Sequence, residues 1–153
     1  MYVNNLKKIY NIRVYISLYL VDIYYNLLIG IILSLNKYNM LVALIELGGN
    51  KERIAKARML IEQSRLLTLQ AAWKIDHLGV KNAMVDISAI KVVVPNMMQE
   101  VVDMALQIFG GGGMCNDYPI AKFAAGARAL RLADGPDEVH MAMVSRLELK
   151  KYR

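Results

Sequence analysis

Residues 82–109 read NAMVDISAIKVVVPNMMQEVVDMALQIF, and this stretch decides the fold. Its apolar side chains recur three and four positions apart, which is the period of an α-helix. They stand at Ala83, Ile87, Ile90, Val94, Met98, Val101, Ala105 and Ile108. Polar side chains are confined mainly to Asn96, Gln99, Glu100, Asp103 and Gln107. Such a broad apolar surface predicts a long helix at the centre of a helical bundle.

The sequence before this stretch predicts a first long helix. Residues 51–78 contain neither Gly nor Pro, and their apolar residues form two rows at helical spacing. Gly79 is a plausible stop for this helix. Trp73 is expected in the core, because a large aromatic side chain is a core candidate before it is a ligand contact.

Two further helices are predicted after the central one. Residues 110–113 are four glycines that end the central helix, and a shorter helix follows Tyr118-Pro119 to about Leu132. The sequence of residues 134–138, DGPDE, then predicts the start of a last helix that runs to about Lys151. Proline suits a first helical turn, and acidic side chains there complement the helix dipole. Three residues of this last helix are expected to face inward: Val139, Met143 and Leu147.

Residues 1–50 differ in composition from the rest of the chain. They hold seven of the nine tyrosines and almost no alanine. Residues 14–35 are long and apolar enough to cross a bilayer, although Asp22 inside the stretch costs about 3 kcal/mol on insertion scales. Three interpretations stay open: a membrane helix, an additional packing helix, or translated non-coding sequence. We favour the last, because Ile, Tyr, Asn, Lys and Leu are frequent when AT-rich sequence is translated.

The fold class follows from these patterns. We predict an all-α fold in which residues 51–153 form a four-helix up-and-down bundle. Residues 1–50 are treated as a separate, atypical segment that adds an extra apolar N-terminal helix. The change in composition falls at the turn-like cluster Gly48-Gly49-Asn50.

Composition excludes several classes of function. The net charge is +6, but the basic residues form no stripe with interleaved aromatics, which argues against nucleic-acid binding. Cys115 is the only cysteine, so a disulfide within the chain is impossible. No metal site is predicted, because no zinc-ligand motif is present and His77 and His140 are far apart in sequence.

Three motifs together resemble the acyl-CoA dehydrogenase family. Residues 107–113, QIFGGGG, followed by Asp117-Tyr118-Pro119, are similar to its Q-x-x-G-G-x-G…[DE]-Y-P signature. Residues 71–76, AAWKID, resemble the preceding helix. Residues 130–140, LRLADGPDEVH, resemble the long eukaryotic branch of the family. The motifs arrive in the order and spacing of the family, over the C-terminal helical domain.

The resemblance implies an activity and a set of site residues. The family uses FAD to oxidise a fatty acyl-CoA to its trans-2-enoyl-CoA in fatty acid β-oxidation. Asp134 aligns with the carboxylate that removes the α-proton, and Gly135 with a glycine at the acyl-CoA thioester. The remaining matches are to FAD-binding positions. Pro136, Asp137 and Glu138 align with a segment touching FAD, and Gln107, Gly110 and Gly111 with backbone that holds the FAD of a neighbouring subunit.

Each of these residues also has a plain structural explanation. Asp134 could cap the last helix, and Asp137 and Glu138 could simply be first-turn acids. The four glycines could be a flexible connection, since they do not form GxGxxG. The chain also departs from the family at Ala125-Gly126, where many members have Arg-Asp.

The family's N-terminal helical domain and middle β-domain have no counterpart in residues 1–50. The resemblance therefore implies a C-terminal fragment of an oxidoreductase that neither holds FAD stoichiometrically nor turns over acyl-CoA when isolated. It further implies a homo-oligomer, an electron-transfer flavoprotein as a possible partner, and a mitochondrial or else peroxisomal location. Two alternatives remain: a membrane-anchored helical interaction protein that uses residues 14–35, and a non-catalytic partner of full-length dehydrogenases.

Overall fold

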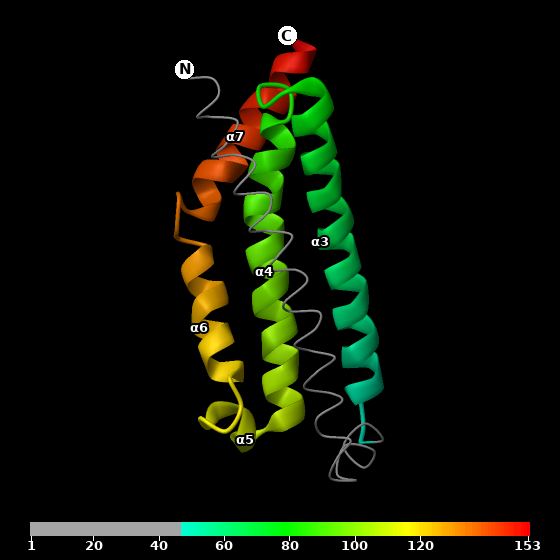
Figure 1. Cartoon of the computed structure of the whole chain (residues 1–153), viewed down its shortest axis with the longest axis vertical. Helices are drawn as coiled ribbons and strands as arrows, with labels where there is room; N and C mark the ends of the chain where they lie inside the picture. Colours follow the sequence, from blue (N-terminus) through cyan, green and yellow to red (C-terminus); the bar gives the residue numbers. More distant parts are fainter. Residues whose placement is uncertain (1–46) are drawn as a thin grey trace.

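The computed structural model describes residues 47–153, which are helical and contain no strand (Figure 1). The elements are α3 (Asn50–Leu78), α4 (Met84–Phe109), α5 (Gly111–Met114), α6 (Ile120–Leu130), α7 (Asp137–Leu149) and the 3₁₀ helix η1 (Lys150–Tyr152). The predicted all-α fold is therefore confirmed. The predicted N-terminal helix and the apolar stretch of residues 14–35 lie outside the described residues. Within residues 47–153, no helix is long and apolar enough to cross a membrane.

Helix α4 lies at the centre of the described helices, as its broad apolar surface predicts. Helix α3 packs along one side of it, and α6 and α7 follow one another along the other side (Figure 1). Helix α4 runs antiparallel to α3, and also to α6 and α7. The connections between the helices are short. The core that this arrangement buries includes Ile61 and Ile75 from α3 and Ile90 and Met98 from α4, each fully buried. Burying one such side chain stabilises the fold by about 1.5–3 kcal/mol.

Helix α3 meets α4 through a face of small and β-branched residues. The face recurs every three or four positions, at Ala57, Ile61, Ser64, Thr68, Ala71 and Ile75. Thr68 is fully buried, and its hydroxyl donates to the Ser64 carbonyl at 2.7 Å, so burial leaves the hydroxyl paired. Near the other end, Lys74 Nζ lies 2.7 Å from Asp86 Oδ1 and joins α3 to α4.

The predicted stop signals mark the ends of the two long helices. Gly79 follows α3 with a φ of 79°, and its N–H donates to the Ile75 carbonyl at 3.2 Å. Gly110 follows α4 with a φ of 57°, and its N–H donates to the Leu106 carbonyl at 2.8 Å. Residues that have a Cβ rarely adopt these backbone conformations, so glycine ends both helices.

Two of the predicted inward positions are wrong. Trp73 is 53% exposed and stacks on His77, because the buried row of α3 is turned away from it. Val139 is 57% exposed. Asp137 is the buried residue of α7, and two helical positions turn a side chain by about 200°, so Val139 points to the opposite side.

Candidate active site

The loop between α6 and α7 carries the predicted catalytic carboxylate. Asp134 has a φ of 57° and Gly135 a φ of 108°, so two successive residues are in the left-handed region. Glycine adopts this region freely, and aspartate is one of the few other residues that tolerate it. Asp134 is the one non-glycine residue with positive φ among residues 47–153. The Asp-Gly pair thus forms the connection between α6 and α7, and Asp134 is exposed.

Asp134 is not the N-cap residue of the helix that follows it. Helix α7 begins at Asp137, and its N-cap residue is Pro136, which makes no side-chain capping hydrogen bond. Pro136 has extended backbone angles, which fits its place one position before the first helical turn. The backbone carbonyl of Asp134 lies 3.3 Å from Nε2 of His140, so the first turn of α7 contacts the loop. Pro136 therefore occupies the N-cap position that the sequence left open for Asp134.

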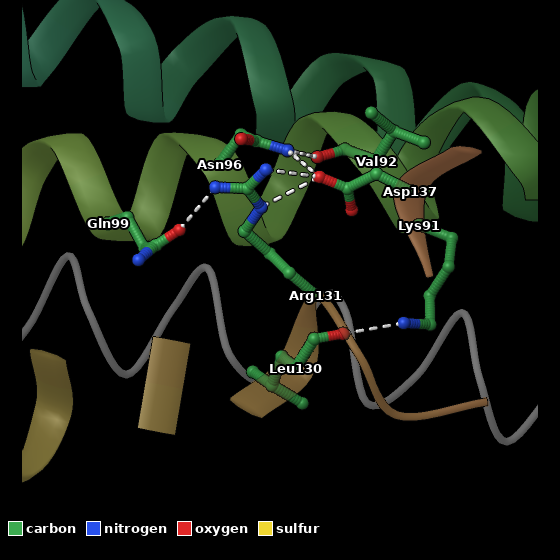
Figure 2. Close-up of polar contacts among 7 residues, drawn as sticks. All are labelled: Lys91, Val92, Asn96, Gln99, Leu130, Arg131 and Asp137. Atoms are coloured by element: carbon green, nitrogen blue, oxygen red, sulfur yellow. Dashed lines mark hydrogen bonds and ion pairs between the residues drawn. The ribbon is translucent and has the colours of Figure 1, made fainter. Parts of the chain in front are cut away.

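A partly buried cluster of polar side chains joins this loop to the central helix (Figure 2). Arg131 Nε and Nη2 both lie 2.7 Å from Asp137 Oδ2. Asn96 Nδ2 from α4 donates to the same oxygen at 3.1 Å and to the Val92 carbonyl at 2.7 Å. Arg131 Nη1 donates to Gln99 Oε1 at 2.8 Å. The carboxylate of Asp137 therefore faces the protein interior, while Pro136 and Glu138 beside it are exposed.

Positive charge surrounds the buried carboxylate of Asp137. Burial acts to raise its pKa, but the hydrogen bonds from Asn96 and Arg131 and the charges of Arg131 and Lys91 outweigh burial. Together they hold the pKa of the Asp137 carboxyl below its ordinary value. Lys91 Nζ itself donates to the Leu130 carbonyl at 2.6 Å, so it also fixes the end of α6. The carboxylate is thus kept ionised inside the protein.

The predicted FAD-binding residues fall into two groups at opposite ends of α6. Pro136, Asp137 and Glu138 lie with Asp134 and Gly135 at its C-terminal end. The other group, Gln107, Gly110 and Gly111, is exposed near α5, before the start of α6 (Figure 1). Helix α6 has 11 residues, which corresponds to a length of about 16 Å. The two groups therefore form separate surfaces of one chain.

The glycines of α5 present bare backbone at the surface. A Cβ added at Gly110, Gly111 or Gly112 would meet no atom within 4 Å, whereas at Gly113 it would press on Phe109 and Leu106. Packing within the described chain therefore does not require glycine at 111 or 112, although glycine weakens a helix by about 1 kcal/mol relative to alanine. Backbone without a Cβ can approach a pyrophosphate closely, so these residues fit the FAD contact that the resemblance implies.

The described residues do not enclose Asp134. One surface depression lies between α4 and α6 and includes Asn96, Gln99 and Arg131 in its wall. A second, mostly apolar depression lies between α4 and α7. Neither depression is lined by Asp134.

The family model for the C-terminal domain of acyl-CoA dehydrogenases matches residues 39–149. This chain belongs to the acyl-CoA dehydrogenase family. Mouse acyl-CoA dehydrogenase family member 10 is 52% identical over 107 residues, which cover 70% of this chain and 10% of that protein. Chicken acyl-CoA dehydrogenase family member 11 is 50% identical over 96 residues, covering 63% of this chain and 12% of that protein.

This chain is also similar to a solved structure. A Mycobacterium abscessus protein assigned to the acyl-CoA dehydrogenases has a TM-score of 0.70 and 59% identity, over 71% of this chain and 27% of that chain. This acyl-CoA dehydrogenase domain thus spans only about a tenth of the animal relatives and about a quarter of the bacterial chain.

Sequence reasoning missed the residues that hold the loop of this acyl-CoA dehydrogenase domain. Asn96 and Gln99 stand out in the sequence only as polar positions of the central helix, and Arg131 and Lys91 have no predicted role. One signal was available: Asn96 and Gln99 are three residues apart, so they share a helical face. A polar patch on a mostly apolar helix needs polar partners when it is buried.

Proposed function

We propose that this domain supplies the catalytic base and part of the flavin-contacting backbone of an FAD-dependent acyl-CoA dehydrogenase. The observation that supports the proposal most directly is the exposure and backbone conformation of Asp134. It is exposed, lies outside the helices, and adopts a left-handed conformation on a loop that is fixed to the central helix. A strained aspartate is kept at functional sites when the surrounding structure over-determines it.

The proposed reaction follows from the chemistry of a thioester. The α-C–H bond of an acyl-CoA is weakly acidic, so its cleavage needs a positioned carboxylate. In our proposal the Asp134 carboxylate takes the α-proton, the electrons of that bond form the new C=C bond, and a hydride leaves the β-carbon. Gly135 lies next to the base and brings bare backbone near the thioester. Bound FAD supplies the redox chemistry as acceptor of this hydride.

The positions of the two glycine-bearing surfaces favour an oligomer. The length of α6 separates Gly110 and Gly111 from Asp134. A flavin bound near Asp134 would therefore lie away from these glycines. We propose that Gln107, Gly110 and Gly111 contact the FAD of a neighbouring subunit. The loop residues Pro136, Asp137 and Glu138 then contact the flavin of their own chain, with Asp137 doing so through its backbone because its carboxylate is engaged internally.

The cellular role remains part of the proposal. Fatty acid β-oxidation, a mitochondrial or else peroxisomal location, and electron transfer to an electron-transfer flavoprotein all follow from the family resemblance. Because the matched stretch covers only about a tenth of the animal relatives, we expect the 153-residue chain alone to be colourless and inactive. In our proposal the reaction needs further parts of a complete dehydrogenase.

A chimera tests the proposal. Residues 51–149 would replace the matched region of the Mycobacterium abscessus protein, whose 59% identity favours a compatible interface. We expect the chimera to purify with flavin and to dehydrogenate acyl-CoA in the presence of an artificial electron acceptor. Flavin released on denaturation and enoyl-CoA formed would be measured, with the unaltered bacterial protein as positive control and the 153-residue chain as negative control.

Each outcome of this experiment has a meaning. A folded, flavin-containing chimera without turnover would contradict the assignment of a catalytic base to this domain. In that case the non-catalytic partner role would be favoured. Flavin and turnover in the isolated 153-residue chain would contradict the need for further parts of a complete dehydrogenase.

A glycine substitution tests the surface at α5. An added Cβ at Gly111 meets no atom within 4 Å, so folding of the Gly111→Leu variant should be unchanged or slightly favoured. In the chimera it should lower flavin occupancy, because the side chain would stand where backbone approaches the cofactor. Gly126→Leu is the matched control, since a Cβ at Gly126 also meets nothing within 4 Å. Equal flavin occupancy in both variants would remove Gly111 from the proposed contact.

A further inference from the structure

Arg131 and Asp137 close the loop that carries Asp134. Arg131 follows the last residue of α6, and Asp137 is the first residue of α7. Two nitrogens of the guanidinium, Nε and Nη2, lie 2.7 Å from Asp137 Oδ2 (Figure 2). The ion pair therefore joins the two ends of residues 132–136 and limits how far they can separate.

The central helix fixes this ion pair in place. Asn96 donates to Asp137 Oδ2 at 3.1 Å, and Gln99 accepts from Arg131 Nη1 at 2.8 Å. Asn96 and Gln99 are three residues apart on α4, so they stand on one face and contact the two halves of the pair. The loop ends are thus attached to each other and to the most buried helix of the domain.

The geometry of Arg131 argues against a role in binding substrate phosphate. Its Nε, Nη1 and Nη2 atoms all contact Asp137 or Gln99. The side chain of Asp137 is only 7% exposed and that of Arg131 33%, so water competes little for the pair. Charge-assisted hydrogen bonds of this kind are short and directional.

The loop needs such attachment. Two successive left-handed residues are unfavourable outside a fixed turn, and Asp134 carries a Cβ. We propose that Arg131 and Asp137 are positioning residues: they clamp residues 132–136 onto α4 and so hold Asp134 in the conformation that presents its carboxylate. The part concerning catalysis rests on the proposed function of Asp134 as the base.

Hydrogen exchange of the full 153-residue chain tests the clamp without flavin or substrate. The amides of Leu132 and Ala133 donate to the Ala129 carbonyl, each at 3.0 Å, and report opening at the start of the loop. Arg131→Met keeps an apolar stem but removes every donor. We expect this variant to speed exchange at both amides by about ten-fold or more. Loss of one hydrogen bond worth about 1.4 kcal/mol corresponds to a ten-fold change.

Three further variants make this result specific. Arg128→Met, in the last turn of α6, is the matched control and should leave both amides unchanged. Arg131→Lys keeps the charge and should restore part of the protection. The double variant, Arg131→Met with Asp137→Leu, should speed amide exchange no more than Arg131→Met or Asp137→Leu alone. Each of these changes removes the same ion pair. Amides of α3 should still exchange more slowly than those of Leu132 and Ala133 in every variant, which separates local opening of the loop from global unfolding.

The catalytic part is tested in the flavin-containing chimera. A misplaced base should lower kcat by about ten- to hundred-fold in Arg131→Met while KM stays unchanged, because substrate binding does not involve the clamp. Arg131→Lys should recover part of kcat.

The outcomes separate the clamp from the proposed function. Loop exchange as slow in Arg131→Met as in Arg128→Met would overturn the clamp. Faster exchange with an unchanged kcat would overturn the positioning role alone. If the unsubstituted chimera is inactive, the proposed function and the positioning role fail together, while the exchange result still decides whether the clamp holds the loop.

Discussion

Asp134→Asn should lower turnover of the flavin-containing chimera by about 10²–10⁴-fold, the usual contribution of a general base. The amide cannot accept the α-proton. Asparagine is also the residue that best tolerates the left-handed region after glycine, so the φ of 57° at this position should persist. The loss would then report chemistry and not a rearranged loop. Stopped-flow measurement of flavin reduction by acyl-CoA would isolate the proton-abstraction step from later electron transfer.

Two companion variants sharpen this prediction. Asp76→Asn removes an exposed carboxylate from the last turns of α3 and should leave flavin reduction unchanged. Asp134→Glu keeps a base but adds a methylene, and it places a longer side chain in a left-handed position. We expect intermediate activity from it. Full activity of Asp134→Asn would show that the proton leaves to another group and would end the assignment of Asp134.

The fold could be predicted from sequence wherever one residue type decides the local backbone. Gly79 and Gly110 end α3 and α4 because each has a positive φ, which glycine adopts without strain. The period of apolar residues in α4 identified the central helix, since few helices bury so wide a face. These features depend on the chain within a few residues of the position concerned.

The orientation of α7 could not be predicted in the same way. Its sequence has no strong single apolar face, so the spacing of apolar residues did not show that Val139 would be exposed. The structure buries Asp137 because Arg131 and Asn96 pair with its carboxylate. Arg131 lies across a non-helical loop from Asp137, and Asn96 lies on a helix some forty residues earlier. The 3.6-residue period of α7 carries no information about contacts with these two residues.

The same reasoning explains what the sequence revealed of the site. Asp134 and the glycines were predicted through motifs that resemble those of the family. Arg131 lies in the motif of residues 130–140 but received no predicted role, and Lys91, Asn96 and Gln99 lie outside the motifs. The cluster that these four residues form emerges only when α4 and α6 are brought together. A residue's role in holding a site therefore depends on tertiary contacts, whereas its role in chemistry is marked by its type and local turn.

Arg131→Met should also destabilise the domain by about 3 kcal/mol at neutral pH, because a buried carboxylate that loses its partner remains desolvated. Among residues 47–153, Asp137 Oδ2 would keep only the 3.1 Å hydrogen bond from Asn96, and Oδ1 already has no hydrogen-bond partner there. For a domain of this size such a loss corresponds to a fall in Tm of about 10–20 °C. Arg128→Met should shift Tm by no more than an exposed substitution does. Equal Tm values for the two variants would contradict a stabilising ion pair.

The pH dependence of this difference identifies Asp137 as the group responsible. The folded protein holds the pKa of Asp137 below its ordinary value, so its ionised form stabilises the fold above the unfolded pKa of about 3.9. That contribution is lost as pH falls through the lower, folded pKa. In Arg131→Met, burial is opposed mainly by Asn96 and Lys91, so the pKa of Asp137 should rise and the contribution should disappear at higher pH. The gap in unfolding free energy between the two proteins should therefore be widest near neutrality and close on acidification. A gap that stays constant to acid pH would assign the effect to lost packing of the arginine stem and not to its charge.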